Sequence, residues 1–424
     1  MPTIAVKTLG CKVNQYDTEA MLELFEKAGY ESVPFEAEAD VYLVNTCTVT
    51  GTSDSKSLKL IRRLNREHPQ SAIIAAGCLT QRAPEKLKLP GVRLLVGVQR
   101  RGEVVELLKQ AIRENRLIDA TAPLENASFE NLSVSRHEGK TRATMKIQEG
   151  CNRYCSYCII PYVRGPVRSM PLCAVEKEAA RLRENGYKEI VVTGIHLASY
   201  GLDTGESLLD ALKIVSGSAE RIRLGSLEPR VANDGFARAL SQIPGICDQF
   251  HLSLQSGCDE TLRRMNRRYT AEEYLSACES LRRYFPSCAI TTDVIVGFPG
   301  ETDEAFEESC AFVRRARLAR LHVFPYSRRS GTVADKLPTQ VPEEVKKLRC
   351  EKLIAIGNTL EEAYVKETVG QIRNVLLETP APDGSAEGHL ENYVRCRVRA
   401  QAGEIKRVRI VSAQDTLTYG EIIE

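Results

Sequence analysis

Short apolar runs alternate with amphipathic stretches through the first part of the chain. The apolar runs have the length of buried strands and lie at residues 3–9, 40–45, 72–76 and 92–98. The amphipathic stretches have a helical period and lie at residues 17–28, 55–67 and 103–113. Strands that alternate with helices in this way predict a parallel, doubly wound sheet, in which ligands bind beyond the carboxyl ends of the strands.

A second alternating series follows and predicts six more β/α units. Its expected strands are residues 142–148, 189–193, 221–226, 250–254, 289–296 and 320–325. Expected helices between and after them include residues 175–185, 302–316 and 342–366. Six such units predict an incomplete β/α barrel, and the active site of such a barrel lies at the carboxyl ends of its strands.

The pattern changes again after residue 370. Short strands are expected at residues 373–378, 393–400 and 406–412, separated by turn-rich segments at 379–388 and 401–403. This pattern predicts a small all-β module. The fold class is therefore α/β with a small C-terminal β module. Its expected divisions are a sheet domain at 1–118, a linker at 119–140, a barrel at 141–365 and the module at 366–424.

Composition excludes several classes of protein. The formal net charge of the 424 residues is only +2, so binding to nucleic acid would depend on local basic patches. No run approaches the ~18 apolar residues of a membrane span, and the first residues lack the apolar core of a signal peptide. We therefore expect a cytoplasmic protein without a membrane partner. In such a protein the 14 cysteines are expected to be reduced thiols, some of them metal ligands, rather than a disulfide framework.

Three cysteines stand close together just after the first expected strand of the barrel. Cys151, Cys155 and Cys158 form a C-x3-C-x2-C cluster. Three thiolates on a short loop can hold three irons of a [4Fe–4S] cube and leave the fourth iron open for a substrate or cofactor. The same offsets also fall on one face of a helix, so three buried cysteines of a core helix are the alternative. Gly150 and Asn152 disfavour that helix.

A second trio is spread over the first domain. Cys11, Cys47 and Cys78 each follow one of the expected parallel strands, which brings them to one edge of the sheet. A single cysteine at such a place is usually a small buried residue. Three at equivalent strand ends favour a shared site.

The first cluster resembles the signature of the radical S-adenosylmethionine superfamily. The segments around the second trio resemble the N-terminal domain of the methylthiotransferases, and the order of sheet, barrel and β module is similar over essentially the whole chain. These segments are residues 10–19, 45–50 and 77–81. The resemblance implies two [4Fe–4S] clusters, S-adenosylmethionine as cofactor, and a C-terminal RNA-binding TRAM module. It implies that Cys11, Cys47 and Cys78 hold one cluster and Cys151, Cys155 and Cys158 the other.

Residues 9–15, 45–50 and 255–259 are most similar to the bacterial branch that acts on N6-threonylcarbamoyladenosine of tRNA. The resemblance implies that one adenosylmethionine methylates a sulfur at the N-terminal cluster. A second yields a radical that abstracts hydrogen from C2 of adenosine 37 in the anticodon loop. A flavodoxin or ferredoxin would supply electrons. The alternatives are methylthiolation of isopentenyladenosine tRNA or of a ribosomal protein, or a non-catalytic iron–sulfur or zinc protein that binds RNA and senses redox state. The oligomeric state is left open.

Several loops at strand ends are candidates for contact with the cofactor, although ordinary loop chemistry explains each of them alone. Those implied by the resemblance are Tyr157, Gly194, Glu228, Gln255, Arg267, Gly297, Phe298, Pro299 and Gly300. Thr302 is expected to cap the helix that follows the last of these loops.

The C-terminal module carries a patterned charge. Alternation places Arg395, Arg397 and Arg399 on one strand face, which predicts either contact with RNA phosphates or a solvated surface. The remaining cysteines share no pattern and are expected to be mostly buried apolar residues, none a required ligand: Cys173, Cys247, Cys258, Cys278, Cys288, Cys310, Cys350 and Cys396.

Overall fold

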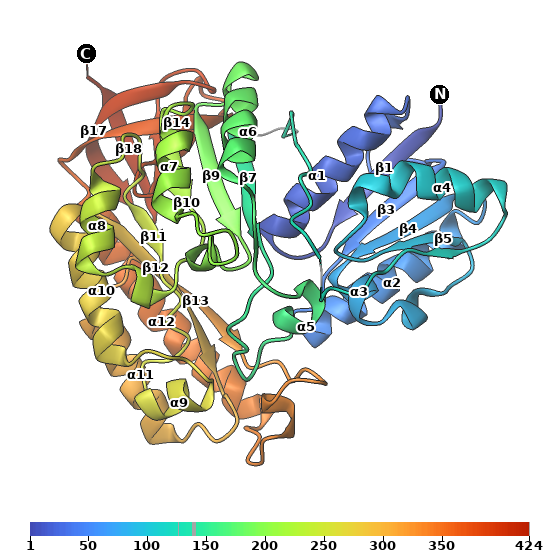
Figure 1. Cartoon of the computed structure of the whole chain (residues 1–424). Coiled ribbons are helices and arrows are strands. Elements are labelled where there is room, and N and C mark those ends of the chain that lie inside the picture. Colours follow the sequence, from blue (N-terminus) through green and yellow to red (C-terminus); the bar gives the residue numbers. More distant parts are fainter. Residues whose placement is uncertain (126, 138–140, 424) are drawn as a thin grey trace.

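The computed structural model describes residues 1–125, 127–137 and 141–423. Its β structure follows the chain in three parts (Figure 1): a six-stranded sheet, a pair of sheets with four and three strands, and a closed barrel of five strands. Among these described residues, none of the helices combines the length and apolar character that a membrane span requires.

The N-terminal sheet is parallel, with the strand order β2-β1-β3-β4-β5-β6. Its strands are β1 Thr3–Thr8, β2 Glu31–Ser32, β3 Val41–Thr46, β4 Ala72–Gly77, β5 Val92–Val96 and β6 Ile118–Asp119. Its α-helices are α1 Lys12–Lys27, α2 Gly51–Glu67, α3 Cys78–Arg82 and α4 Val104–Arg113. Helices α1 and α4 cover one face and α2 and α3 the other, so β3 and β4 are buried along their whole length. The predicted doubly wound sheet is confirmed.

The central part is an incomplete barrel of parallel strands. These strands are β7 Arg142–Glu149, β9 Glu189–Gly194, β10 Arg221–Leu224, β11 Gln249–His251, β12 Ala289–Val296 and β13 Arg320–Pro325. The main helices are α6 Leu172–Glu184, α7 Leu208–Ser216, α8 Asp234–Ser241, α10 Ala271–Tyr284, α11 Asp303–Arg315 and α12 Glu343–Glu367. Isolated parallel bridges connect β10 to the segments around β11, and a short antiparallel strand, β8 (Arg168–Ser169), pairs with β7. The expected partial barrel is confirmed, although the third strand ends at Leu224, before Ser226.

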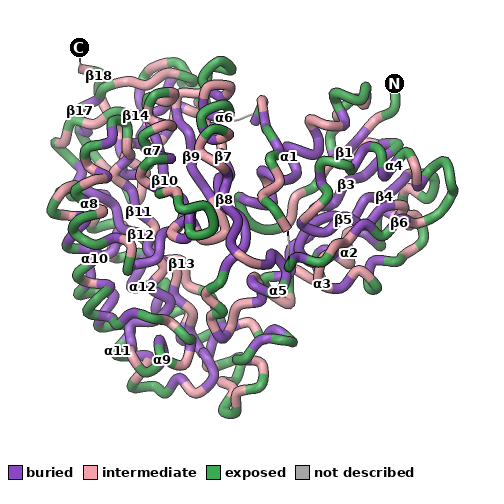
Figure 2. Tube along the Cα trace, in the orientation of Figure 1, coloured by how far each residue is buried: buried purple, intermediate pink, exposed green. Residues whose placement is uncertain are grey.

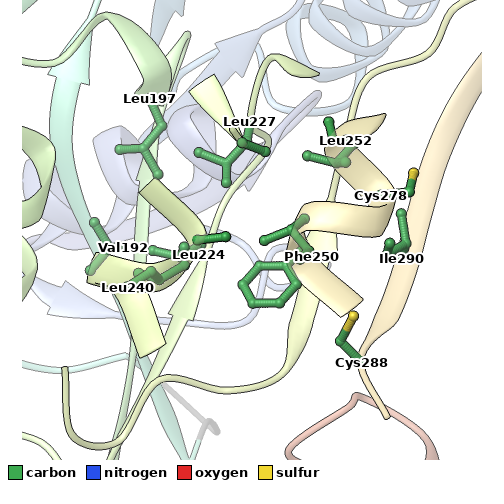
Figure 3. Close-up of a cluster of buried hydrophobic side chains, with 14 of the residues drawn as sticks. Val192, Leu197, Leu224, Leu227, Leu240, Phe250, Leu252, Cys278, Cys288 and Ile290 are labelled. Carbon is green, nitrogen blue, oxygen red and sulfur yellow. The ribbon is translucent and has the colours of Figure 1, made fainter. Parts of the chain in front are cut away.

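The apolar core of the barrel domain contains three of the cysteines that were expected to be core residues: Cys278, Cys288 and Cys310. Cys278 and Cys288 lie beside Phe250 and Ile290 in this core (Figure 3). Cys247, Cys258 and Cys396 are buried too, whereas Cys350 is partly exposed and Cys173 exposed. Figure 2 shows the same division along the chain, with buried strands inside and exposed helix faces outside.

The segment at 119–140, expected to be a linker, packs closely on the first domain over its described part. Leu132 and Val134 are buried against Tyr16 and Ala20 of α1. Residues 126 and 138–140 of this segment lie outside the described residues. The part around residues 132–134 therefore covers α1, whereas Leu124 packs beside Cys78 and Val163.

The C-terminal module is a closed barrel with two strands more than expected. Its strands are β14 Ile372–Pro380, β15 Ala386–Leu390, β16 Arg395–Val398, β17 Ile405–Gln414 and β18 Leu417–Ile422. The interpretation of 379–388 as turn-rich was partly wrong, because β14 extends into it and β15 begins within it. Because β15 contains Gly388, the sequence pattern did not predict this strand. A Cβ at this position would lie 1.8 Å from the carbonyl oxygen of Leu376, so glycine permits the close strand approach.

Two buried arginines attach this module to the end of the β/α barrel where the strands begin. Arg221 donates to the carbonyl oxygens of His389 and Leu390 at 3.1 and 3.0 Å, and Arg223 donates to that of Glu391 at 2.9 Å. Arg223 also pairs with Glu189 at 2.9 Å. The module is thus fixed at the rim opposite to the one that carries the cysteine loop.

We expect Arg223→Ala to destabilise the protein by about 3–5 kcal/mol, because it removes one partner of a buried ion pair. The Tm should fall, and limited proteolysis should release the C-terminal module faster. Lys213→Ala is the matched control, since Lys213 and Asp210 form an exposed pair. Its effect should stay within about 0.5 kcal/mol. Equal Tm values for the two variants would contradict the docking role of Arg223.

Candidate active site between the sheet and the barrel

The three cysteines of the N-terminal sheet meet at its carboxyl edge. Cys11 occupies the position before the first residue of α1, Cys78 begins α3, and Cys47 follows β3. A Cβ at Gly10 would lie 3.0 Å from the Cys47 sulfur, which places Cys47 beside the turn that carries Cys11. Cys47 and Cys78 are buried and Cys11 is exposed.

The pKa values of these thiols also indicate that the three side chains lie close together. Burial raises the pKa of Cys78 to about 12, and the Cys11 and Cys47 sulfurs add to this rise. Burial also raises the pKa of Cys47, again with a contribution from Cys11. Thiols of this kind are protonated until a metal displaces the proton.

The second trio lies on a loop without helical structure. Residues 151–159 contain no helix, so the core-helix alternative is wrong. Burial raises the pKa of Cys151 to about 11 and that of Cys158 to about 12, and Cys155 contributes to both. The loop is held at its ends: the Cys151 amide donates to the Gly165 carbonyl at 3.0 Å, and the Ser156 amide donates to the Met265 carbonyl at 3.0 Å.

One arginine donates to each trio. Arg164 Nε lies 3.2 Å from the Cys78 sulfur, and Arg267 Nη1 lies 3.2 Å from the Cys155 sulfur. In the described part of the chain, no three His, Cys, Asp or Glu side chains converge tightly enough for a single metal ion. An iron–sulfur cube gives each cysteine an iron of its own, so its thiolates need not meet at one point. Three thiols and a nearby cation in each trio fit such an anionic group.

Some of the candidate cofactor residues lie together at the barrel mouth. Tyr157 packs with Phe298 and Tyr326. Glu228 pairs with Arg153 of the cysteine loop at 2.5 Å and with His196, two residues beyond Gly194, at 3.2 Å.

The other candidates have structural partners. Gln255 has a left-handed backbone, φ 70°, and its amide donates to the carbonyl of Asp293. The space beside Gly297 and Gly300 is occupied by protein: Cβ atoms there would meet Lys346 at 2.3 Å and Arg264 at 1.9 Å. Pro299 between them is buried. Thr302 caps α11 as expected. Cofactor contact by these residues stays a prediction.

The strand face of the C-terminal module alternates as expected. Arg395 and Arg399 are exposed and Arg397 is partly exposed, while Cys396 and Val398 point into the barrel. Arg397 pairs with Glu387 of the neighbouring strand.

A buried ion network between the sheet and the barrel was not predicted from the sequence. Asp17 of α1 and Glu149 of β7 share three cations from separate segments: Arg101, Lys146 and Arg164. Burial by itself would raise the pKa of Asp17 and Glu149, but the three cations outweigh it and hold both values below normal. Both carboxylates are therefore ionised and bind the two domains together.

Comparison with known proteins agrees with this architecture. A family model for the radical SAM superfamily matches residues 145–313, and a model described as uncharacterized protein family UPF0004 matches residues 3–97. The threonylcarbamoyladenosine tRNA methylthiotransferase MtaB of Bacillus subtilis is 39% identical, over 100% of this chain and 97% of its own length. The chain belongs to the radical SAM tRNA methylthiotransferase family.

Further relatives come from two branches of this methylthiotransferase family. MtaB of Thermotoga maritima is 35% identical over 98% of this chain and 96% of its own. The tRNA-2-methylthio-N6-dimethylallyladenosine synthase of Clostridium novyi is 34% identical over 99% and 96%. A methylthiotransferase is an enzyme that uses S-adenosylmethionine and iron–sulfur chemistry, so the alternative of a non-catalytic redox sensor is wrong.

Solved structures share the fold of this methylthiotransferase at low sequence identity. The radical S-adenosylmethionine methyltransferase TsrM from Kitasatospora setae, solved with cobalamin and a [4Fe–4S] cluster, has a TM-score of 0.58 at 14% identity. The match covers 78% of this chain and 74% of TsrM. The cobalamin-dependent enzyme OxsB has a TM-score of 0.52 at 13% identity, over 84% of this chain and 56% of OxsB.

We expect Gly150→Ala to reduce the iron bound by the barrel trio. A Cβ at Gly150 would lie 1.8 Å from the carbonyl oxygen of Pro166, so the loop that carries Cys151 must move. Gly186→Ala is the control, because Gly186 also has a positive φ but has nothing within 4 Å of an added Cβ. It should cost only about 1–2 kcal/mol of stability. Iron content after anaerobic reconstitution is the measurement, and full iron content in Gly150→Ala would contradict this expectation.

Proposed function

We propose that this enzyme adds a methylthio group to C2 of N6-threonylcarbamoyladenosine at position 37 of tRNA, in the cytoplasm, with two [4Fe–4S] clusters. Cys11, Cys47 and Cys78 hold one cluster, and Cys151, Cys155 and Cys158 hold the other. The observation that carries the proposal is the placement of two thiol trios at strand ends on either side of one buried ion network. Similarity over the whole length to MtaB supports the choice of substrate.

The two thiol trios have different roles in the reaction. When bound, the barrel cluster and S-adenosylmethionine supply a radical able to abstract hydrogen from an aromatic carbon. The three cysteines of the loop at 150–158 would hold the barrel cluster, and Arg267 donates to the Cys155 sulfur. Tyr157 and Glu228 lie at the mouth where the cofactor is expected. The N-terminal trio holds the sulfur that is transferred, and a flavodoxin or ferredoxin supplies electrons.

The four divisions of the chain have separate roles, and the last of them binds the RNA. We assign the sheet to residues 1–118, the connecting segment to 119–140, the radical barrel to 141–365 and the RNA-binding module to 366–424. Arg395 and Arg397 of β16 and Arg399 directly after it are at least partly exposed and are the proposed contacts to tRNA phosphates.

Separate variants of the two trios should separate two activities. Cys155→Ala should abolish formation of 5′-deoxyadenosine, because the barrel cluster loses a ligand. Cys47→Ala should spare cofactor cleavage and stop sulfur insertion. The measurements are 5′-deoxyadenosine release under dithionite and mass spectrometry of the tRNA nucleosides. The same behaviour in both variants would contradict the division of labour.

Lys12 offers a way to distinguish between the substrates of the two branches. It follows Cys11 and is reached by solvent, although protein surrounds its amine. Burial lowers the pKa of Lys12, Tyr393 and Glu189 raise it, and Arg142 and Arg223 lower it further. Charged groups of the barrel and of the C-terminal module are therefore close enough to act on the Lys12 amine. A threonylcarbamoyl group has a carboxylate that such a cation can pair with, whereas a dimethylallyl group is apolar.

We expect Lys12→Met to lower methylthiolation of threonylcarbamoyladenosine tRNA about tenfold or more, since a hydrogen bond to a charged group is worth about 1.5–3 kcal/mol. Iron content should stay unchanged. Lys59→Met on the exposed surface of α2 is the control and should keep full activity. Equal activity of the two variants would remove Lys12 from substrate recognition. Product formation only on dimethylallyladenosine tRNA would overturn the proposed substrate itself.

A further inference from the structure

Arg164 is a fully buried side chain that touches both halves of the active site. It ends α5 (Ile160–Arg164), the short helix that follows the barrel cysteine loop. Its Nε donates to the Cys78 sulfur at 3.2 Å, and its Nη1 lies 2.6 Å from Glu149 and 3.1 Å from Asp17. Glu149 is joined through Gly150 to Cys151. One guanidinium group therefore connects a thiol of the first trio with the backbone that begins the second.

Asn14 extends this connection to the other two cysteines of the first trio. Arg164 Nη2 donates to the Asn14 side-chain oxygen. The Asn14 amide donates in turn to the carbonyls of Leu9 and Thr46, at 2.8 and 2.9 Å. Leu9 lies two residues before Cys11, and Thr46 directly precedes Cys47. Arg164 and Asn14 together thus contact the surroundings of all three thiols.

We propose that Arg164 is a positioning residue, which holds the two thiol trios in a fixed relation and donates a hydrogen bond to the Cys78 sulfur when the first trio carries its cluster. This inference rests on the two-cluster arrangement of the proposed function. Hydrogen bonds to cluster sulfurs are one of the factors that set the reduction potential. A donor and positive charge at Cys78 stabilises the reduced, more negative cluster and raises its potential. The Arg164 side chain also fixes the distance between the two trios, which the methylthio group has to cross.

Simple neutralisation of the buried carboxylates is the competing explanation. Arg101 provides the comparison, because it also pairs with Asp17 and Glu149 and is equally buried. Its third partner is Glu130 at 2.9 Å. The contacts of Arg101 include no thiol within the described part of the chain. A role in charge balance alone predicts similar effects for both arginines.

The first experiment measures one cluster at a time. In a full-length protein with Cys151, Cys155 and Cys158 changed to alanine, only the first trio can bind a cluster. Arg164→Gln and Arg101→Gln are introduced separately, and the midpoint potential is followed by electron paramagnetic resonance during redox titration. Arg164→Gln should shift the potential to a more negative value, by more than twice the shift caused by Arg101→Gln, on the expectation that direct contacts to the sulfur dominate. Equal shifts, or no shift with iron retained, would overturn the proposal.

Arg164→Lys and Arg101→Lys keep the positive charge and cover the case in which the glutamine variants do not fold. In the enzyme with both trios intact, Arg164→Lys should keep cofactor cleavage while the 5′-deoxyadenosine formed per methylthiolated nucleoside rises about tenfold, as for loss of an outer-shell partner of a metal site. Arg101→Lys should keep the wild-type ratio. A wild-type ratio in Arg164→Lys would contradict the positioning role. Absence of iron from the parent protein with only the first trio would instead defeat the two-cluster proposal, so the two failures are distinguishable.

Discussion

The active site depends on two carboxylates that would be unstable if either stood alone. Asp17 comes from the first helix of the sheet domain and Glu149 from the first strand of the barrel, and both are ionised in the protein interior. A buried charge without partners costs several kcal/mol. The three cations around this pair come from three different segments, so the network is satisfied only when sheet and barrel are docked. Domain docking and assembly of the site are therefore one event.

Much of the fold could be predicted from the sequence because its signal is local. Each parallel strand is a short apolar run, and each cysteine of a trio follows a strand or begins a loop directly after one. The strands of the C-terminal barrel were harder to predict, since β15 and β18 each contain a glycine that interrupts the apolar alternation. Their pairing is made by neighbours across the barrel, which no local pattern records.

The ion network was not predictable for a different reason. Its members lie at positions 17, 101, 146, 149 and 164, without a common period, and each alone has the appearance of an ordinary surface charge. Only the three-dimensional approach of α1, β7, α5 and the turn at Arg101–Glu103 brings them together. The glycines at 297 and 300 were predicted to permit close approach of the cofactor, and the structure places Lys346 and Arg264 beside them, so cofactor contact there stays a prediction.

The docking of the C-terminal barrel has a consequence for the shape of the RNA that fits. Arg221 and Arg223 hold this module at the rim where the strands begin, while the cysteine loop lies at the rim where they end (Figure 1). A strand of eight residues such as β12 spans about 26 Å at about 3.3 Å per residue. A nucleic acid that touches both rims has to run along the flank of the barrel for that length. The proposed phosphate contacts on this module and the cysteine loop therefore lie at opposite ends of the barrel, and an RNA bound as proposed would have to reach from one end to the other.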